Sequence, residues 1–127
     1  MTVPDLYAFL SQFKLGVLST IGGGNAPQSA LVGIAVSERL EIIFDTVKTS
    51  RKSANLIAQP GCSFVIGWAA EQTVQYDGRA EELRGDALAP FLQIYFDAWP
   101  ECRAHLNWPV PSIHYPYFCN CAVCIAI

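Results

Sequence analysis

Very short turns separate the strand-like segments of this chain, and they constrain its fold more than any other feature. Residues 15–21 are apolar and partly β-branched, and the glycine-rich run 22–25 that follows is typical of a hairpin turn. A second strand is predicted at 26–36, and the turn at 37–39 leads into a third strand at 40–46. Strands joined this closely pair antiparallel, because a parallel pair needs a crossover connection of a dozen residues or more.

Three helices and three further strands are predicted for the rest of the chain. Apolar residues at helical spacing predict helices at about 4–13 and 86–98, and a hydroxyl suited to capping predicts one at about 50–58. The order of elements predicts an α+β, mainly β fold in which residues 1–127 form one domain, a six-stranded antiparallel barrel with peripheral helices. The remaining strands are expected at 62–68, 72–83 and 113–127.

The composition limits the kinds of partner that this chain can have. Hydrophobic residues make up 52% of the sequence and charged residues only 15%, so a homodimer that covers apolar surface is expected. The net charge of −3 argues against nucleic acid as a partner. No apolar run approaches the ~20 residues of a membrane span. Asp5 and the lack of a basic N-terminal region argue against a signal peptide, so a cytoplasmic protein is expected.

The cysteines present a possible metal site that the strand pattern disfavours. There are five, an odd number that fits free thiols in a cytoplasmic protein. On a strand, Cys119 and Cys121 face one side and Cys124 faces the other, and no second CxxC completes a tetrahedral site. Buried thiols are therefore favoured over zinc and no metal is predicted, although the role of the three cysteines stays open.

No catalytic residue can be assigned from the sequence. Glu81 and Glu82 are neighbours in a predicted strand, so they face opposite sides and cannot act as a joint acid–base pair. The two histidines, His105 and His114, have no Ser or Cys nucleophile placed beside them by any pattern. Hydrolytic chemistry is therefore disfavoured.

A basic turn between a buried strand and a helix is the best candidate for a binding site. Lys48, Arg51 and Lys52 fall within five positions, and Thr49 or Ser50 is a natural N-cap. Cations in the first turn of a helix are opposed by the helix dipole. Together with free amides and hydroxyls they predict a phosphate site, although a solvated basic loop is the alternative. Its place after the third strand of a meander, outside any βαβ unit, disfavours nucleoside triphosphates and dinucleotides as the source of that phosphate.

Several segments of the chain resemble one known family. The strand end Phe44-Asp45-Thr46, followed by the run from Ser50 to Leu56 (SRKSANL), is similar to the pyridoxamine 5'-phosphate oxidase-like family of FMN-binding split β-barrels. The resemblance covers roughly residues 5–98. The segments 15–20, 26–30, 59–63 and 74–80 are similar to further strands of that family, the last carrying a glycine.

The resemblance implies a split β-barrel that binds FMN at a homodimer interface. It implies that Ser50, Arg51 and Lys52 hold the FMN phosphate and that Gln75 reaches the flavin of either subunit. The flavin ring would then run beside Phe44, Asp45, Thr46 and Val47, with Ala30 and Leu31 as its floor. Residues 113–127 are atypical: after 117 they are rich in cysteine, lack basic residues and are unlike the family.

The function implied by the resemblance is that of an FMN-dependent oxidoreductase acting on a small molecule. The substrate and the electron donor stay unassigned. The alternative is a non-catalytic flavin-binding protein, or one without a cofactor, that serves in stress or redox sensing or as an interaction module. Heme or a deazaflavin in the same groove is a further alternative to FMN.

Overall fold

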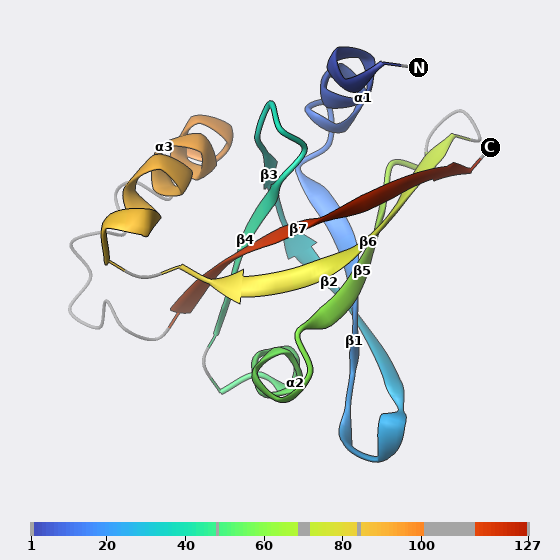
Figure 1. Cartoon of the computed structure of the whole chain (residues 1–127), viewed down its shortest axis with the longest axis vertical. Helices are drawn as coiled ribbons and strands as arrows, with labels where there is room; N and C mark the ends of the chain where they lie inside the picture. Colours follow the sequence, from blue (N-terminus) through green and yellow to red (C-terminus); the bar gives the residue numbers. More distant parts are fainter. Residues whose placement is uncertain (1, 48, 69–71, 84, 101–113, 127) are drawn as a thin grey trace.

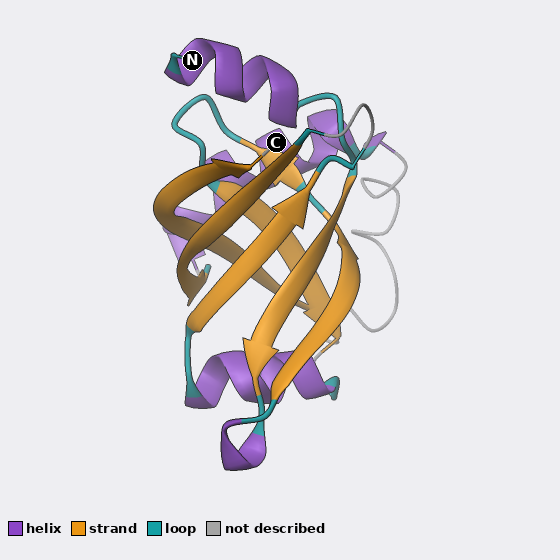
Figure 2. Cartoon of the chain, turned by 90° about the vertical axis from the view of Figure 1, so that its right-hand side faces the viewer, coloured by secondary structure: helices purple, strands orange, loops and turns teal. Residues whose placement is uncertain are grey.

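One curled antiparallel sheet forms the body of the protein (Figures 1 and 2). The structure is a computed structural model that describes residues 2–47, 49–68, 72–83, 85–100 and 114–126, with the backbone alone for 47, 85 and 114–126. The strands of this part follow the order β2-β1-β5-β6-β7-β4-β3. They are β1 (Leu15–Ile21), β2 (Pro27–Gly33), β3 (Ala35–Val36), β4 (Ile42–Val47), β5 (Gly61–Ile66), β6 (Thr73–Glu82) and β7 (His114–Ala126).

The predicted six-stranded barrel is wrong in its strand count. The described sheet has seven strands, because the expected strand at 26–36 is divided into β2 and β3. Up to Ile34 the segment bonds to the β1 side, where the Ile34 amide donates to the Lys14 carbonyl at 2.8 Å. The indole N–H of Trp99 donates a hydrogen bond to the Ile34 carbonyl at 2.9 Å. Ala35 and Val36, which follow, pair with β4 and not with β1. Within the described residues no strand pairing joins β2 to β3, so the curled sheet is not closed.

The antiparallel pairing and the C-terminal strand are as predicted. Each pair of neighbouring strands is antiparallel. The hairpin of β1 and β2 turns through a short 3₁₀ segment, Gly23–Asn25, in which Gly24 has a φ of 73°. Strand β7 lies between β6 and β4, and it thereby connects the two halves of the sheet (Figure 1).

Three α-helices lie around the sheet, close to the predicted positions. They are α1 (Val3–Leu10), α2 (Arg51–Ala58) and α3 (Leu88–Ala98), the last preceded by a 3₁₀ turn at Gly85–Ala87. Thr2 and Asp5 form a capping box at the start of α1. No helix in the described ranges is long and apolar enough to cross a membrane.

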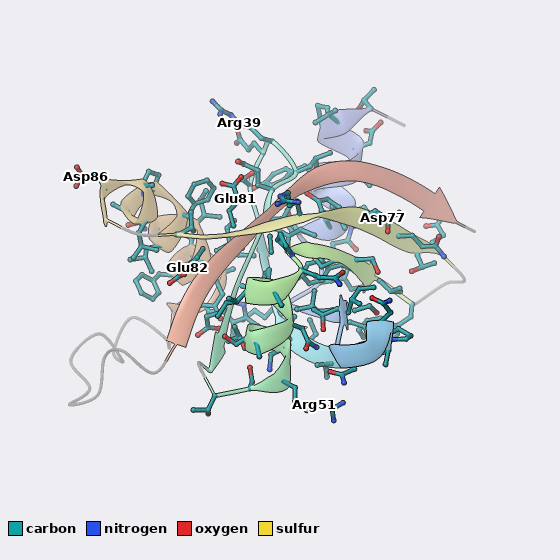
Figure 3. The ribbon with its side chains drawn as sticks, turned by 60° about the horizontal axis from the view of Figure 1, so that its bottom comes forward. Arg39, Arg51, Asp77, Glu81, Glu82 and Asp86 are labelled. Atoms are coloured by element: carbon teal, nitrogen blue, oxygen red, sulfur yellow. The ribbon has the colours of Figure 1, made fainter. Side chains whose placement is uncertain are left out.

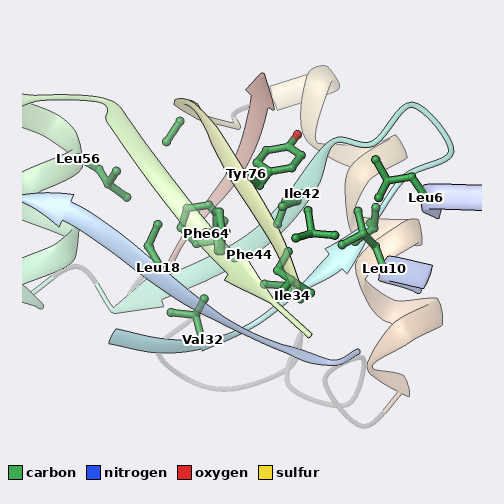
Figure 4. Packing of buried hydrophobic residues seen from close by; sticks show 14 residues of the cluster. Leu6, Leu10, Leu18, Val32, Ile34, Ile42, Phe44, Leu56, Phe64 and Tyr76 are labelled. Carbon is green, nitrogen blue, oxygen red and sulfur yellow. The ribbon is translucent and has the colours of Figure 1, made fainter. Parts of the chain in front are cut away.

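A single hydrophobic core fills the curled sheet (Figure 4). Phe44 and Phe64 meet edge to face with ring centres 5.4 Å apart, and Tyr76 contacts Phe64 in the same way at 6.4 Å. Leu56 of α2 is buried at one end of this core, and two leucines of α1 are buried at the other. Burial of Leu56 holds α2 against the sheet, and this fixes the place of the basic turn.

Candidate functional site

The start of α2 is organised by a chain of hydroxyl groups. Ser50 is the N-cap, and its Oγ accepts a hydrogen bond from the Ser53 amide at 3.2 Å. The hydroxyl of Thr46, buried at the end of β4, lies 2.8 Å from the same Oγ. The predicted cap is therefore confirmed at Ser50, and Thr46 ties it to the strand.

A cavity of about 440 Å³ lies between this helix start and the β1–β2 hairpin. Its volume is within the range of small-molecule sites. Three predicted phosphate ligands and Ala30 of the predicted floor line it, together with hairpin residues that had not been predicted. The lining comprises Leu18, Thr20, Pro27, Gln28, Ser29, Ala30, Ser50, Arg51 and Lys52.

The electrostatics of this cavity favour an anion. Arg51 is exposed (Figure 3) and Lys52 is half-buried. In the described part of the chain, neither side chain forms a hydrogen bond or an ion pair. The first turn of α2 carries no acidic residue. Two cations therefore lie at the positive end of a helix dipole without a neutralising partner, an arrangement that a bound anion relieves.

The hydroxyl of Ser53 is a further unsatisfied group on the first turn of α2. Ser53 is fully buried, and its Oγ has no hydrogen-bond partner among the described residues. Buried hydroxyls in folded proteins are nearly always bonded. Ser53 does not line the cavity, so its hydroxyl is an unpartnered group of the packed helix start and not a contact for a ligand there.

Asn55 joins α2 to the hairpin, and sequence reasoning missed it. Its Nδ2 donates to Thr20 Oγ1 at 3.0 Å and to Gln28 Oε1 at 2.8 Å. Thr20 and Gln28 are directly opposite each other in the hairpin register. The hairpin turn predicted at 22–25 was the signal that could have paired these two residues, whereas their contact with Asn55 depends on how α2 docks.

Of the β4 residues that were predicted to run beside a flavin ring, Phe44, Asp45 and Thr46 do not line this cavity. Phe44 is buried in the core, and Asp45 accepts a hydrogen bond from the Tyr95 hydroxyl at 2.9 Å. Thr46 contacts the helix cap. The side chain of Val47 lies outside the described residues.

Leu31 and Gln75 lie on the outer face of the sheet, away from the cavity. The register places Leu31, Val17, Val65 and Gln75 in one row across four neighbouring strands. Leu31 is 59% exposed and Val65 is 38% exposed, and Gln75 is exposed as well. Contact of either predicted residue with a cofactor through a partner subunit stays a prediction.

A larger hollow of about 900 Å³ lies between α1, α3 and the turn after β3. Its charged lining residues are Lys14, Arg39, Glu38, Glu41 and Asp97, so acids outnumber bases. An anion is therefore better matched by the smaller cavity, where both charged residues are cations.

No metal site is found in the described part of the chain. No group of three or more His, Cys, Asp or Glu side chains there is placed to hold an ion. The side chains of Cys119, Cys121 and Cys124 lie outside the described residues, as does all of His105.

Known proteins share both the sequence pattern and the fold. No curated protein matches the chain. Among solved structures, a heme binding protein from Mycobacterium smegmatis has 16% identity and a TM-score of 0.82, and the match covers 99% of this chain but 54% of that one. This chain thus spans about half of that protein. General Stress Protein 26 from Bacillus anthracis has 18% identity and a TM-score of 0.73, with coverages of 98% and 94%.

An FAD-binding protein from Mesorhizobium loti has 21% identity and a TM-score of 0.70, with coverages of 97% and 90%. At such identities the likeness shows the fold alone. The sequence model of the pyridoxamine 5'-phosphate oxidase family, in contrast, matches residues 3–104, most of the chain. The chain therefore belongs to the pyridoxamine 5'-phosphate oxidase family.

Proposed function

We propose that this protein binds FMN, with the phosphate held at the start of α2, and acts as an oxidoreductase on a small molecule. The observation that carries this proposal is a pair of cations, Arg51 and Lys52, that have no partner among the described residues and lie beside the capped helix start and a cavity. Arg51 offers a planar fork to the phosphate oxygens, Lys52 a point charge and Ser50 a hydroxyl. Ala30 would contact the less polar part of the ligand.

The residues around the cavity would bind and orient the ligand, and Lys52 is the one side chain of the described lining that belongs to an acid–base type. The described lining contains no Asp, Glu, His, Cys or Tyr. When bound, FMN supplies hydride and electron transfer at its isoalloxazine ring. The chain's own part is then to place the ligand and to neutralise its charge. The same absence also supports the alternative of a flavin-binding protein without turnover.

We favour a flavin over heme as the cofactor of this cavity. Heme iron is held by an axial His, Cys, Met or Tyr, and the described lining residues include none of these. The similar protein from Mycobacterium smegmatis is a heme binding protein, and the one from Mesorhizobium loti is an FAD-binding protein. The cations and hydroxyls of this chain suit a phosphate-bearing cofactor.

We also propose a homodimer that uses the outer face of the sheet. Leu31, Val17 and Val65 form an apolar row there that a second copy would cover. Such a copy would bring Gln75 and Leu31 close to a neighbouring subunit. Sedimentation or light scattering of wild type and of Leu31→Glu tests this: a wild-type dimer that the charge dissociates is expected.

The absorption spectrum and the mass of the bound compound test the cofactor assignment. A preparation with a flavin spectrum that releases FMN is expected, whereas a deazaflavin would differ in mass. NAD(P)H reduction followed by reoxidation with screened acceptors then separates an enzyme from a non-catalytic binder.

The double variant Arg51→Ala/Lys52→Ala tests the phosphate assignment. Each lost charge-assisted contact is expected to weaken FMN binding by about 1.5–3 kcal/mol, roughly tenfold or more. Lys14→Ala/Arg39→Ala is the matched control, because it removes the two cations of the larger hollow and should leave FMN binding unchanged. Full FMN occupancy in the first double variant would refute the assignment.

A further inference from the structure

The side-chain amide of Asn55 uses both of its hydrogens on the wall of the smaller cavity, beside the start of α2. One is donated to Thr20 Oγ1 at 3.0 Å and the other to Gln28 Oε1 at 2.8 Å. Both acceptors line the cavity, and Thr20 is only 3% exposed. Asn55 itself does not line the cavity, so any effect that it has on a ligand passes through these two residues.

These two bonds fix which atoms of the wall remain available to a ligand. Once Gln28 Oε1 accepts from Asn55, the Nε2 end of the same amide is the free end, and it makes no hydrogen bond within the described residues. An ideal Cβ at Gly22 would lie 2.8 Å from this Nε2. Because glycine has no Cβ, the Gln28 amide fits at this position without a clash. Thr20 Oγ1 likewise accepts from Asn55 and keeps its own hydrogen to donate.

The remaining groups of the wall offer donors too. Arg51 and Lys52 carry only donors. Ser50 Oγ accepts from the Ser53 amide and lies 2.8 Å from Thr46 Oγ1, so its own hydrogen is available to a ligand when Thr46 is the donor of that pair. The Ser29 hydroxyl lies 2.9 Å from that of Ser19. Among the described side chains of the wall, a ligand group therefore meets mainly hydrogen-bond donors, and the acceptors left for a hydrogen of its own are the remaining lone pairs of the hydroxyls.

We propose that Asn55 is a positioning residue that orients Gln28 and Thr20 as donors, so that the site selects the fully deprotonated phosphate. This inference rests on the proposed binding of FMN. A phosphate monoester loses its second proton near a pKa of about 6. The dianion has acceptors alone, whereas the monoanion carries a P–OH hydrogen that needs an acceptor. With the Asn55 amide removed, Gln28 can rotate and present its Oε1 to that hydrogen.

The experiment measures FMN affinity of the intact protein one pH unit above and one below that pKa of about 6. Wild type is expected to bind more weakly at the lower pH. Asn55→Leu keeps the size of the side chain and removes both donors. It is expected to lose about tenfold in affinity at the higher pH and to show a smaller ratio between the two pH values.

Two further variants keep the result interpretable. Gln28→Met lies on the hairpin, outside α2, and the loss of its donor should weaken FMN binding by about tenfold even if Asn55→Leu does not fold. Gln93→Met is the matched control, because it removes a glutamine amide bonded to Asp97 on α3 and should retain the wild-type affinity and pH ratio.

The possible failures can be told apart. If wild type binds no FMN, the proposed function is refuted, and the role of Asn55 with it. If wild type binds FMN but Asn55→Leu keeps the wild-type pH ratio, only the role of Asn55 is refuted, since a merely structural residue would lower affinity without changing that ratio. Unchanged affinity in Gln28→Met would refute the role given to Gln28.

Discussion

Truncation of Leu56 tests whether the apolar contact of α2 with the core holds the phosphate site in place. Leu56 is 3% exposed and belongs to the hydrophobic core cluster, although it does not line the cavity. Its neighbour Ile57 is 65% exposed on the same helix. Leu56→Ala and Ile57→Ala therefore form a matched pair that differs mainly in burial.

The structure allows the size of the effect to be worked out. Leu56→Ala removes three carbons, which at about 0.8 kcal/mol each gives a transfer loss of about 2.4 kcal/mol. The cavity left in a packed core raises the cost to about 3–4 kcal/mol. Ile57→Ala removes carbons that are mostly in water and introduces a better helix former, so a change within about 0.5 kcal/mol is expected.

Urea unfolding gives the free energy of each variant, and FMN titration gives the affinity of the folded fraction. Leu56→Ala should lower both stability and FMN affinity, because α2 loses its buried contact and the helix start shifts relative to the hairpin. Ile57→Ala should resemble wild type in both. If Ile57→Ala destabilises as much as Leu56→Ala, or if Leu56→Ala binds FMN like wild type, the docking of α2 does not depend on this burial.

Two smaller predictions concern the helix caps. Ser50→Ala removes the N-cap of α2 and the partner of Thr46 Oγ1, so it should cost about 1 kcal/mol in urea unfolding. Asp5 has a pKa below its usual 3.8 because it accepts hydrogen bonds from the backbone and side chain of Thr2. Its contribution to stability is thus present above pH 3.8 and lost as the pH falls through the lowered pKa, and Asp5→Asn should abolish that part of the acid dependence.

Local patterns were sufficient to predict most elements of the fold. The strand at 15–21 has the predicted bounds, since the glycine-rich turn marks where it ends. The cap of α2 was predictable because a serine hydroxyl and a helix start interact within four residues. Arg51 and Lys52 could also be predicted as part of the helix start, because they directly follow Ser50 in the sequence. Each of these features depends on neighbours in the chain.

The features that were missed depend on residues far apart. The division of the strand at 26–36 follows from Trp99, whose indole bonds to a carbonyl 65 residues earlier. Gly33 leaves room for that ring, since a Cβ there would lie 3.0 Å from it. No local pattern indicates this contact. The contacts of Asn55 likewise reach 27 and 35 residues back along the chain.

Two adjacent residues of α2, Asn55 and Leu56, attach the helix to two different parts of the protein, and both contacts help to shape the cavity. Leu56 anchors the helix to the hydrophobic core, and Asn55 anchors it to the hairpin through hydrogen bonds. The helix start and the hairpin are thus fixed relative to each other before any ligand arrives. A preformed cavity saves the ordering cost of binding. Arg51 and Lys52, which form no ion pair within the described residues, would then contribute to the affinity for a phosphate without first breaking such a pair.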